Sequence, residues 1–168
     1  MKLTFSPASP FARKARIAAI ETGLIDKIEF VSAAVTPGQP NEEYSRITPL
    51  KKLPVLILDN GDVILDSYVI VEYLDELAGG GKLIPASGPE RWRVKSDHSL
   101  LQGMLDSMLL CRYENMTRPE PMRCRRRPGP RGSYSSVRRL SATPFGTGPN
   151  KQRARQRWIS ACTIGRGA

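Results

Sequence analysis

The stretch KKLPVLILDNGDVILDSYVIVEYLDEL, residues 51–77, decides the fold of this chain. Asn60-Gly61 separates two apolar runs, residues 55–58 and 63–65, and both residues of this pair tolerate a positive φ, which is the strongest short-range signal for a β-hairpin. Helical spacing follows at Ile70, Tyr73, Leu74 and Leu77. The stretch therefore predicts an antiparallel hairpin that leads directly into an amphipathic helix, which the glycines at 79–81 end.

Two places in this stretch suggest ligand binding. Pro54 opens the first strand, and a proline there donates no hydrogen bond and can be cis in a tight turn, so an extended peptide could pair with Val55. Asp66-Ser67 stands at the start of the helix, where free N–H groups and a hydroxyl can hold a carboxylate while the Asp side chain binds an ammonium. Together these groups would hold both ends of an amino-acid head group. Each also has a structural reading, as an edge-strand proline and as helix caps.

Charge is distributed unevenly along the 168 residues, whose apolar content of 40% is enough for a core. The formal net charge is +10, but all 16 acidic residues and 14 of the 26 basic ones lie in residues 1–122, which sum to −2. The other 12 basic residues lie in residues 123–168, which contain no acid. The chain therefore reads as a near-neutral globular part followed by a strongly basic tail.

The chain shows no sign of export or of metal binding. No apolar run reaches the length of a membrane span and the N-terminus lacks a secretory signal, so we expect a cytoplasmic protein. Its cysteines, Cys111, Cys124 and Cys162, lack metal-ligand spacing, and none occurs early enough for a C-x-x-C redox site in the front half. We expect no metal and no disulfide framework.

The residues before the hairpin predict a parallel pair of strands. Residues 2–5 form a short strand, and Ser9 before Pro10 predicts an N-cap followed by proline at the first helical position. A second strand over residues 27–31 follows the helix, which implies a right-handed crossover. With a short helix over residues 42–47, the front part reads βαβ-α-ββα.

This order and three motifs resemble the thioredoxin-like N-terminal domain of glutathione S-transferases. The motifs are SPASPFARKAR at 6–16, NEEYSRITPLKKLPVL at 41–56 and DSYVIVEYLDE at 66–76. The resemblance implies an α/β thioredoxin-like glutathione-binding domain over residues 1–80. It implies that residues 81–122 are a linker and the first helix of an all-α domain, a helix with an apolar stripe at Leu101, Met104, Leu105, Met108 and Leu109.

The resemblance also implies a glutathione site. Val55, after a cis Pro54, would pair with the cysteinyl backbone, with Leu53 beside it in the site. The γ-glutamyl end would be held by Asp66 and Ser67, and Lys52 is positioned for the glycine carboxylate. Glutathione would be a co-substrate, no other cofactor is expected, and the family implies a homodimer.

Ser9 is the catalytic residue that the resemblance implies, because its hydroxyl would hydrogen-bond the glutathione sulfur. A hydroxyl donor and a helix N-terminus both favour an anion, so they would lower the thiol pKa from its usual value of about 8.5 and supply a thiolate for attack on a small electrophile. A serine cannot form a mixed disulfide, which argues against glutaredoxin-like relatives. Ser6 is the fallback candidate, and Ser9 could also be an N-cap without further function.

The tail has two readings. Residues 123–168, rich in Arg, Gly and Pro, could be a disordered basic arm that binds nucleic acid non-specifically through phosphates, in an otherwise non-catalytic interaction protein. We favour a frameshifted end of a detoxifying transferase, because residues 158–161 can be encoded by codons that read Leu-Asp-Ile-Gly in the neighbouring frame. The helical domain would then be truncated, its apolar stripe exposed and turnover weak or absent. His98, the only histidine, is expected on a solvated helix face.

Overall fold

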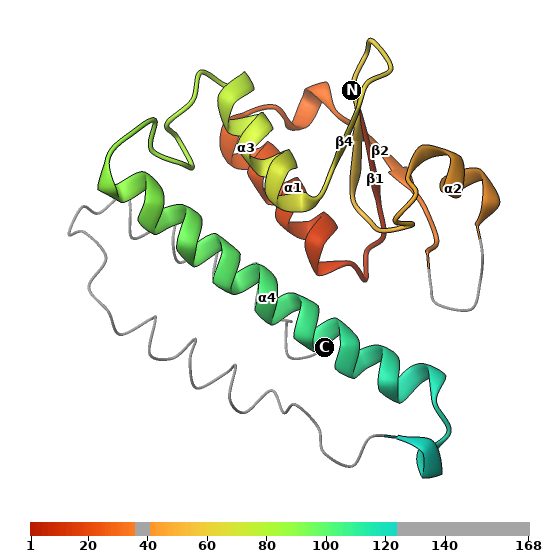
Figure 1. Ribbon diagram of the computed structural model, residues 1–168. Coiled ribbons are helices and arrows are strands. Elements are labelled where there is room, and N and C mark those ends of the chain that lie inside the picture. The colour runs from red at the N-terminus through yellow and green to blue at the C-terminus, as the bar shows by residue number, and fades with distance from the viewer. Residues whose placement is uncertain (36–40, 124–168) are drawn as a thin grey trace.

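The structure, a computed structural model, describes residues 1–35 and 41–123. Its elements are β1 (Lys2–Phe5), α1 (Pro10–Thr22), β2 (Glu29–Ser32), α2 (Glu42–Ile47), β3 (Val55–Ile57), β4 (Val63–Leu65), α3 (Ser67–Leu77) and α4 (Pro89–Thr117), with short 3-10 turns at Ile25–Lys27 and Glu120–Met122 (Figure 1). The predicted βαβ-α-ββα order is confirmed. Both readings of the basic tail concern residues that, from 124 onward, lie outside the described part.

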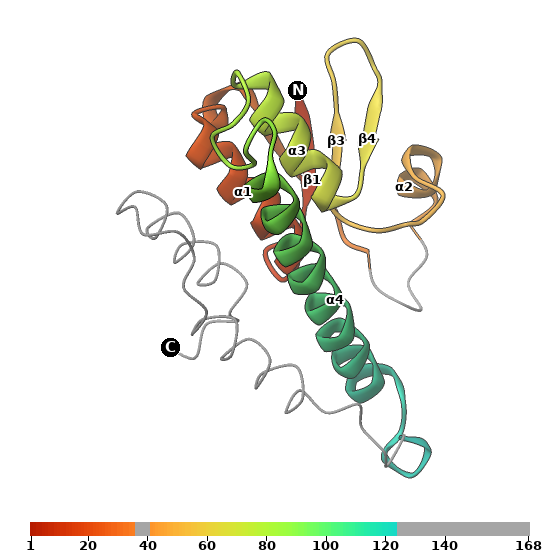
Figure 2. The same cartoon turned by 60° about the vertical axis from the view of Figure 1, so that its left-hand side comes forward.

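The four strands form one mixed sheet in the order β2-β1-β3-β4. β1 is parallel to β2, as predicted, and antiparallel to β3, which is in turn antiparallel to β4. Helices α1 and α3 cover one face of the sheet, and α2 lies on the other side (Figure 2). β2 begins two residues later than predicted because the 3-10 turn Ile25–Lys27 occupies the start of the expected strand.

The β3–β4 hairpin is confirmed, but its loop is longer than a two-residue turn. The N–H of Leu58 donates to the Asp62 carbonyl at 2.8 Å, and the N–H of Gly61 donates to the Leu58 carbonyl at 3.0 Å. Gly61 has a φ of 90°, whereas Asn60 is not among the positive-φ residues. Asn60 contributes its side chain instead, because its Oδ1 accepts the N–H of Asp62 at 3.0 Å. The Asn-Gly pair therefore shapes the turn through one glycine and one side-chain contact.

The core lies between the sheet and the pair α1 and α3. Leu3 and Leu56 point from the sheet into a cluster formed by Ala15, Ala18 and Ala19 of α1 and Ile70, Val71 and Leu74 of α3. The small alanine side chains allow α1 to approach the sheet and α3 closely, so the two helices form one packed layer. The apolar positions predicted for α3 thus face the core, except Leu77, which is exposed, and Tyr73, which is half-buried at its edge.

Helix α4 runs beside α3 and is joined to it by ion pairs. Glu72 of α3 accepts from Arg91 at 2.6 Å and from Lys95 at 2.9 and 3.0 Å. The hydrogen bond from Lys95 is the main reason why the pKa of Glu72 lies below its usual value, with both nearby cations adding to the effect. The first half of α4 is therefore docked on the thioredoxin-like domain.

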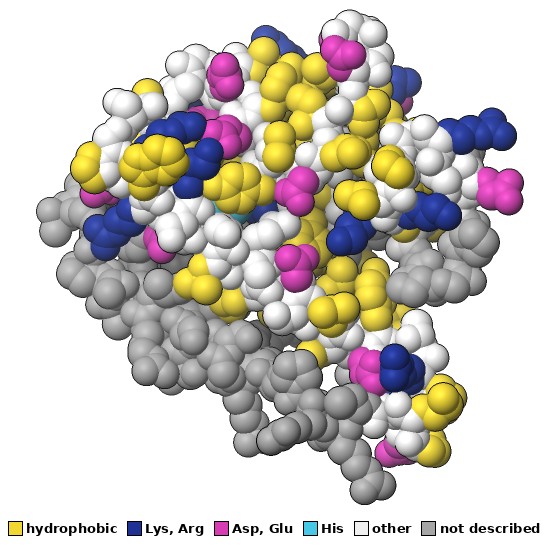
Figure 3. All heavy atoms as spheres, viewed as in Figure 1, with side chains coloured by type: hydrophobic (Ala, Val, Ile, Leu, Met, Phe, Trp, Pro, Cys, Tyr) yellow, Lys and Arg dark blue, Asp and Glu magenta, His cyan; other side chains and the backbone are white. Residues whose placement is uncertain are grey.

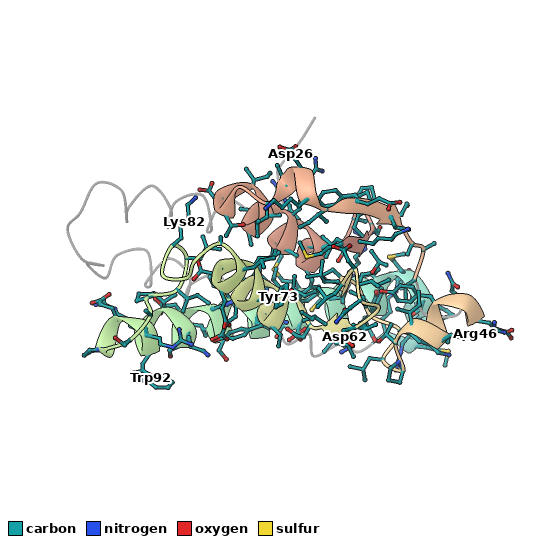
Figure 4. The ribbon with its side chains drawn as sticks, turned by 90° about the horizontal axis from the view of Figure 1, so that it is seen from above. Asp26, Arg46, Asp62, Tyr73, Lys82 and Trp92 are labelled. Carbon is teal, nitrogen blue, oxygen red and sulfur yellow. The ribbon has the colours of Figure 1, made fainter. Side chains whose placement is uncertain are left out.

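The predicted apolar stripe of α4 is only partly exposed. Leu105 is buried, contrary to the expected exposure of the whole stripe, while the other predicted stripe residues are half-buried. Leu110, outside the predicted stripe, is 69% exposed. Trp92 points away from α1 and α3 into solvent (Figure 4). Across residues 1–35 and 41–123, no helix combines the length and the apolar character that a membrane crossing requires.

Candidate functional site

Three segments that are distant in sequence adjoin one end of the sheet, where β1 and β4 end and β3 begins. The register pairs Thr4 of β1 with Val55 of β3, and Val55 with Leu65 of β4. Because β3 is antiparallel to both β1 and β4, the start of β3 lies beside the ends of β1 and β4. The loop that leads to Ser9, the Leu53–Pro54 bond and the Asp66-Ser67 pair therefore all adjoin the same end of the sheet.

Ser9 caps helix α1. Its Oγ accepts the N–H of Ala12 at 3.2 Å, and its own N–H donates to the Ser6 carbonyl at 3.0 Å. A hydroxyl that accepts one bond still has a proton to donate, so Ser9 can be a cap and a donor to a ligand at once. The first turn of α1 contains no acidic residue, which leaves the helix N-terminus favourable for an anion. Ser6, the fallback, accepts only a long contact of 3.4 Å from Ala8.

The Leu53–Pro54 peptide bond is cis, as predicted. Val55, however, lies inside the domain: β3 is an interior strand, Val55 is fully buried, and its N–H donates to Thr4 Oγ1 at 2.9 Å. A ligand backbone cannot reach Val55 in this arrangement. The half-buried residue before the cis bond, Leu53, is where an extended peptide could approach.

A buried hydroxyl pair, missed from the sequence, holds this loop in place. Thr4 Oγ1 and the Tyr44 hydroxyl lie 2.9 Å apart, and the Tyr44 hydroxyl donates to the Lys52 carbonyl at 3.0 Å. Burial raises the pKa of Tyr44, and the hydrogen bond with Thr4 opposes this rise. Threonine in a strand and tyrosine in a short helix carry no sequence signal for this role, because the contact joins residues 40 positions apart.

Lys52 itself is exposed beside this loop, with Lys51 next to it in a positive-φ conformation of 50°. Its backbone is anchored through Tyr44 while its side chain extends into solvent. A cation on an exposed, anchored loop can contact a carboxylate without a desolvation cost of its own. The predicted position of Lys52 at the site edge is therefore compatible with a role in ligand binding.

Asp66 and Ser67 form the N-terminus of α3. Asp66 is the N-cap, with its carboxylate accepting the N–H of Tyr68 at 2.6 Å, and it adopts a φ of 69°. This conformation is uncommon for a residue with a side chain, and such outliers are frequent at binding sites. Asp66 is exposed, whereas Ser67 is only 2% exposed and its Oγ lies 3.5 Å from Gln102 Oε1 of α4.

Helix α4 contributes residues that sequence reasoning did not place at the site. The Gln102 amide oxygen also accepts from the buried ammonium of Lys14. His98, one turn earlier, is 7% exposed and stacks on Tyr68 with ring centroids 4.0 Å apart, so the expected solvated position was wrong. Burial, together with Lys14 and Lys95, lowers the pKa of His98 to about 3, and the imidazole is therefore neutral at pH 7. The sequence spacing of α4 alone gave no sign of these contacts.

The face of the molecule shown in Figure 3 has mixed character. Basic and acidic side chains are interspersed with hydrophobic ones on the face shown in Figure 3. This mixture fits the near balance of charge in residues 1–122. On this face, the described residues form no strongly basic surface of the kind that nucleic acid binding requires.

Comparison with known proteins identifies the domain. Residues 8–77 match the family described as "Glutathione S-transferase, N-terminal domain". The chain is 32% identical to the uncharacterized GST-like protein YibF of Escherichia coli over 110 residues. The matched segment covers 66% of this chain and 52% of the relative. The chain therefore spans about half the length of this relative.

Solved structures agree with this match. A glutathione transferase family member from Pseudomonas fluorescens, with bound glutathione, has a TM-score of 0.74 and 35% identity, over 82% of this chain and 66% of its own. A glutathione S-transferase from Methylobacterium radiotolerans, in complex with glutathione sulfonate, has a TM-score of 0.75 and 25% identity. The match covers 95% of this chain and 77% of the chain of that structure. The chain therefore belongs, through residues 8–77, to the glutathione S-transferase N-terminal domain family.

Proposed function

We propose that this protein binds glutathione and joins it, through its sulfur, to small electrophiles. The observation that carries the proposal is the strand register, which brings the end of β1, the start of β3 and the end of β4 to one end of the sheet. The residues of the proposed site, Ser9, Leu53, Asp66 and Ser67, belong to the segments that adjoin these strand ends. Support also comes from the bound glutathione in the Pseudomonas fluorescens relative. In this proposal Ser9 offers a hydroxyl donor to the glutathione sulfur, and Leu53 offers its backbone to the cysteinyl residue. Asp66 and Ser67 offer groups that can bind the γ-glutamyl residue.

Each proposed contact follows from local chemistry. Leu53, rather than the buried Val55, pairs with the cysteinyl backbone. The Asp66 carboxylate binds the γ-glutamyl ammonium, Ser67 binds the adjoining carboxylate, and Lys52 binds the glycine carboxylate. Each of the three residues of glutathione is thus bound by groups of opposite charge or by matching hydrogen-bonding groups.

Ser9 has the catalytic role in this proposal. Its hydroxyl donates to the glutathione sulfur at the N-terminus of α1, and both effects stabilise the thiolate and lower the thiol pKa. The thiolate then attacks an electrophilic carbon, forming a C–S bond as the leaving group departs with its electron pair. We expect weak turnover from this chain, as the change of composition after residue 122 predicts.

The test compares Ser9→Ala with Ser6→Ala. Calorimetry measures glutathione affinity, ultraviolet absorbance of the thiolate measures the pKa of bound glutathione, and a conjugation assay with an aryl halide measures turnover. We expect Ser9→Ala to bind within about threefold of wild type, with a thiol pKa at least about one unit higher and at least about tenfold slower conjugation. Ser6→Ala should resemble wild type in all three.

A wild-type chain that binds no glutathione while its circular dichroism shows folded helices would refute the proposed binding. An unchanged thiol pKa in Ser9→Ala would refute the catalytic assignment while leaving the binding proposal intact. Because the pKa of the bound thiol is measured without an electrophile, this readout remains informative even if conjugation is too slow to detect.

A further inference from the structure

The tip of the β3–β4 hairpin contains a chemically labile pair of residues. Asparagine is thermally labile in proteins, and Asn60 is the only asparagine of the chain that is followed by glycine. Asn60 and Gly61 are both exposed, and the loop that carries them projects away from α1 and α3 (Figure 2). On the side of Gly61 where a Cβ would stand, no described heavy atom outside its two chain neighbours lies within 4 Å. Water therefore reaches the Asn60 side chain and the peptide nitrogen of Gly61.

The Gly61 nitrogen can attack the side-chain amide carbon of Asn60. Once this nitrogen has lost its proton to a base in solution, its electron pair forms a bond to Cγ of Asn60, the Cγ–Nδ2 bond breaks, and the amide group takes a proton from water and leaves as ammonia. The product is a five-membered succinimide ring, which water opens at either carbonyl to give aspartate or isoaspartate. Glycine favours the ring closure because it has no side chain to hinder the attack. Water is the only co-reactant.

In the closed hairpin both reacting groups are held by hydrogen bonds. The Gly61 N–H donates to the Leu58 carbonyl at 3.0 Å. The Asn60 side chain binds Asp62 twice, because Oδ1 accepts the N–H of Asp62 at 3.0 Å and Nδ2 donates to Asp62 Oδ2 at 2.7 Å. A proton engaged in a hydrogen bond is harder to remove, and a neighbouring carboxylate disfavours the negative charge that the nitrogen acquires. The closed hairpin therefore opposes the attack.

The same hairpin lies where local opening costs little free energy. β4 is an edge strand of three residues, and within the described sheet it pairs only with β3. Hydrogen bonds at the exposed tip of such a hairpin can open without global unfolding of the domain. Opening releases the Gly61 N–H and the Asn60 side chain together, so the attack becomes possible in an otherwise folded chain.

We propose that Asn60 is a site of spontaneous deamidation in the folded protein, and that opening of the hairpin tip gates the reaction. This inference is independent of the proposed glutathione binding. Conversion to aspartate replaces the donor Nδ2 with a second carboxylate against Asp62. Isoaspartate also adds a methylene group to the backbone of a loop that the Leu58 N–H closes by donating to the Asp62 carbonyl. Both products therefore weaken the hairpin in which they form.

The test follows deamidation by mass spectrometry at mildly alkaline pH, in the full chain and in a synthetic peptide of residues 55–65. The peptide shows the reaction without the sheet. Asn60 should convert at least about threefold more slowly in the folded chain than in the peptide, because only the open fraction of the tip reacts. It should still convert at least about tenfold faster than Asn41 and Asn115, which are not followed by glycine.

Two variants test the gate and its consequence. Asp62→Ala removes the carboxylate that holds Asn60 Nδ2. It should accelerate deamidation of the folded chain at least about threefold, while the same substitution in the peptide, which is the matched control, should change the rate by less than about twofold. Asn60→Asp reproduces the aspartate product, and the Leu58 N–H should then exchange with solvent deuterium at least about threefold faster than in wild type.

The outcomes separate the site from its gate. If Asn60 in the folded chain converts no faster than Asn41 and Asn115 after the peptide has reacted, the modification site itself is overturned. Equal rates in the folded chain and the peptide, or equal acceleration of both by Asp62→Ala, would overturn the gating. Unchanged exchange of the Leu58 N–H in Asn60→Asp would overturn the predicted weakening. If Asp62→Ala does not fold, the comparison of the wild-type chain with the peptide still decides the question.

Discussion

Acidification should destabilise this protein through His98. The imidazole is buried against Tyr68 at the contact between α3 and α4, and its pKa is lowered to about 3 from the ordinary value of 6.5. Between these two values the unfolded chain binds a proton that the folded chain does not. The free energy of unfolding therefore falls as the pH is lowered through 6.5 and continues to fall until about pH 3.

The magnitude follows from the two pKa values. Each pKa unit corresponds to about 1.36 kcal/mol, so between pH 8 and pH 5 the free energy of unfolding should fall by about 2 kcal/mol through this one residue. His98 is the only histidine in the chain, and unperturbed carboxyl groups titrate near pH 4. The change between pH 8 and pH 5 is thus attributable to His98 more directly than in a chain with several histidines.

The assay is urea denaturation, followed by circular dichroism at pH 8, 6.5 and 5, on wild type and His98→Phe. Phenylalanine retains an aromatic ring beside Tyr68 but cannot bind a proton, so the variant should lose most of the fall in unfolding free energy. The reasoning is refuted if both proteins show the same pH dependence, or if the imidazole titrates near 6.5 in nuclear magnetic resonance spectra of the folded chain.

Two other substitutions test contacts that hold loops to the folded domain. Asp75 is buried and its carboxylate accepts the N–H groups of residues 82–84 at 2.8 to 3.1 Å, so Asp75→Asn should lower the free energy of unfolding by about 2–4 kcal/mol. The exposed neighbour of Asp75 provides the control, because Glu76→Gln should change the free energy of unfolding by less than about 0.5 kcal/mol. If urea denaturation shows equal losses for the two variants, the stabilising role of Asp75 is contradicted. Tyr44→Phe removes the hydroxyl that holds the Lys52 carbonyl and should cost about 1–2 kcal/mol and weaken glutathione binding in calorimetry. Because the raised pKa of Tyr44 lets the unfolded chain lose its proton first, wild-type stability should fall above pH 10 and that of the variant should fall less.

Local signals predicted the elements of this fold well. The N-cap Ser9, the Asn60-Gly61 turn and the cap at Asp66 are each set by residues within a few positions, and each appears at the expected place. The apolar periodicity of α3 is likewise a local property. These features determine where helices and strands begin, which is why the βαβ-α-ββα order could be derived before any contact was known.

The side chains that join elements could not be predicted in this way. Lys14 and His98 are polar residues whose spacing on their helices is typical of a solvated face, yet both are buried where α1, α3 and α4 meet. Val55 seemed accessible because the sequence does not reveal that β3 has a strand on either side. Burial of a polar group depends on partners from other elements, and these partners are separated by up to 88 positions in the chain.

Because three segments that are distant in sequence meet at one end of the sheet, the concentration of a ligand bound there would affect the amount of folded protein. The segments that carry Ser9, Leu53 and Ser67 adjoin one another only after β1, β3 and β4 have paired, so an unfolded chain lacks the proposed ligand site. A ligand held there at about 100 times its dissociation constant would add about 2.7 kcal/mol to the free energy of unfolding. In a cell that holds such a ligand in excess, the chain's resistance to proteolysis would therefore rise and fall with the supply of the ligand.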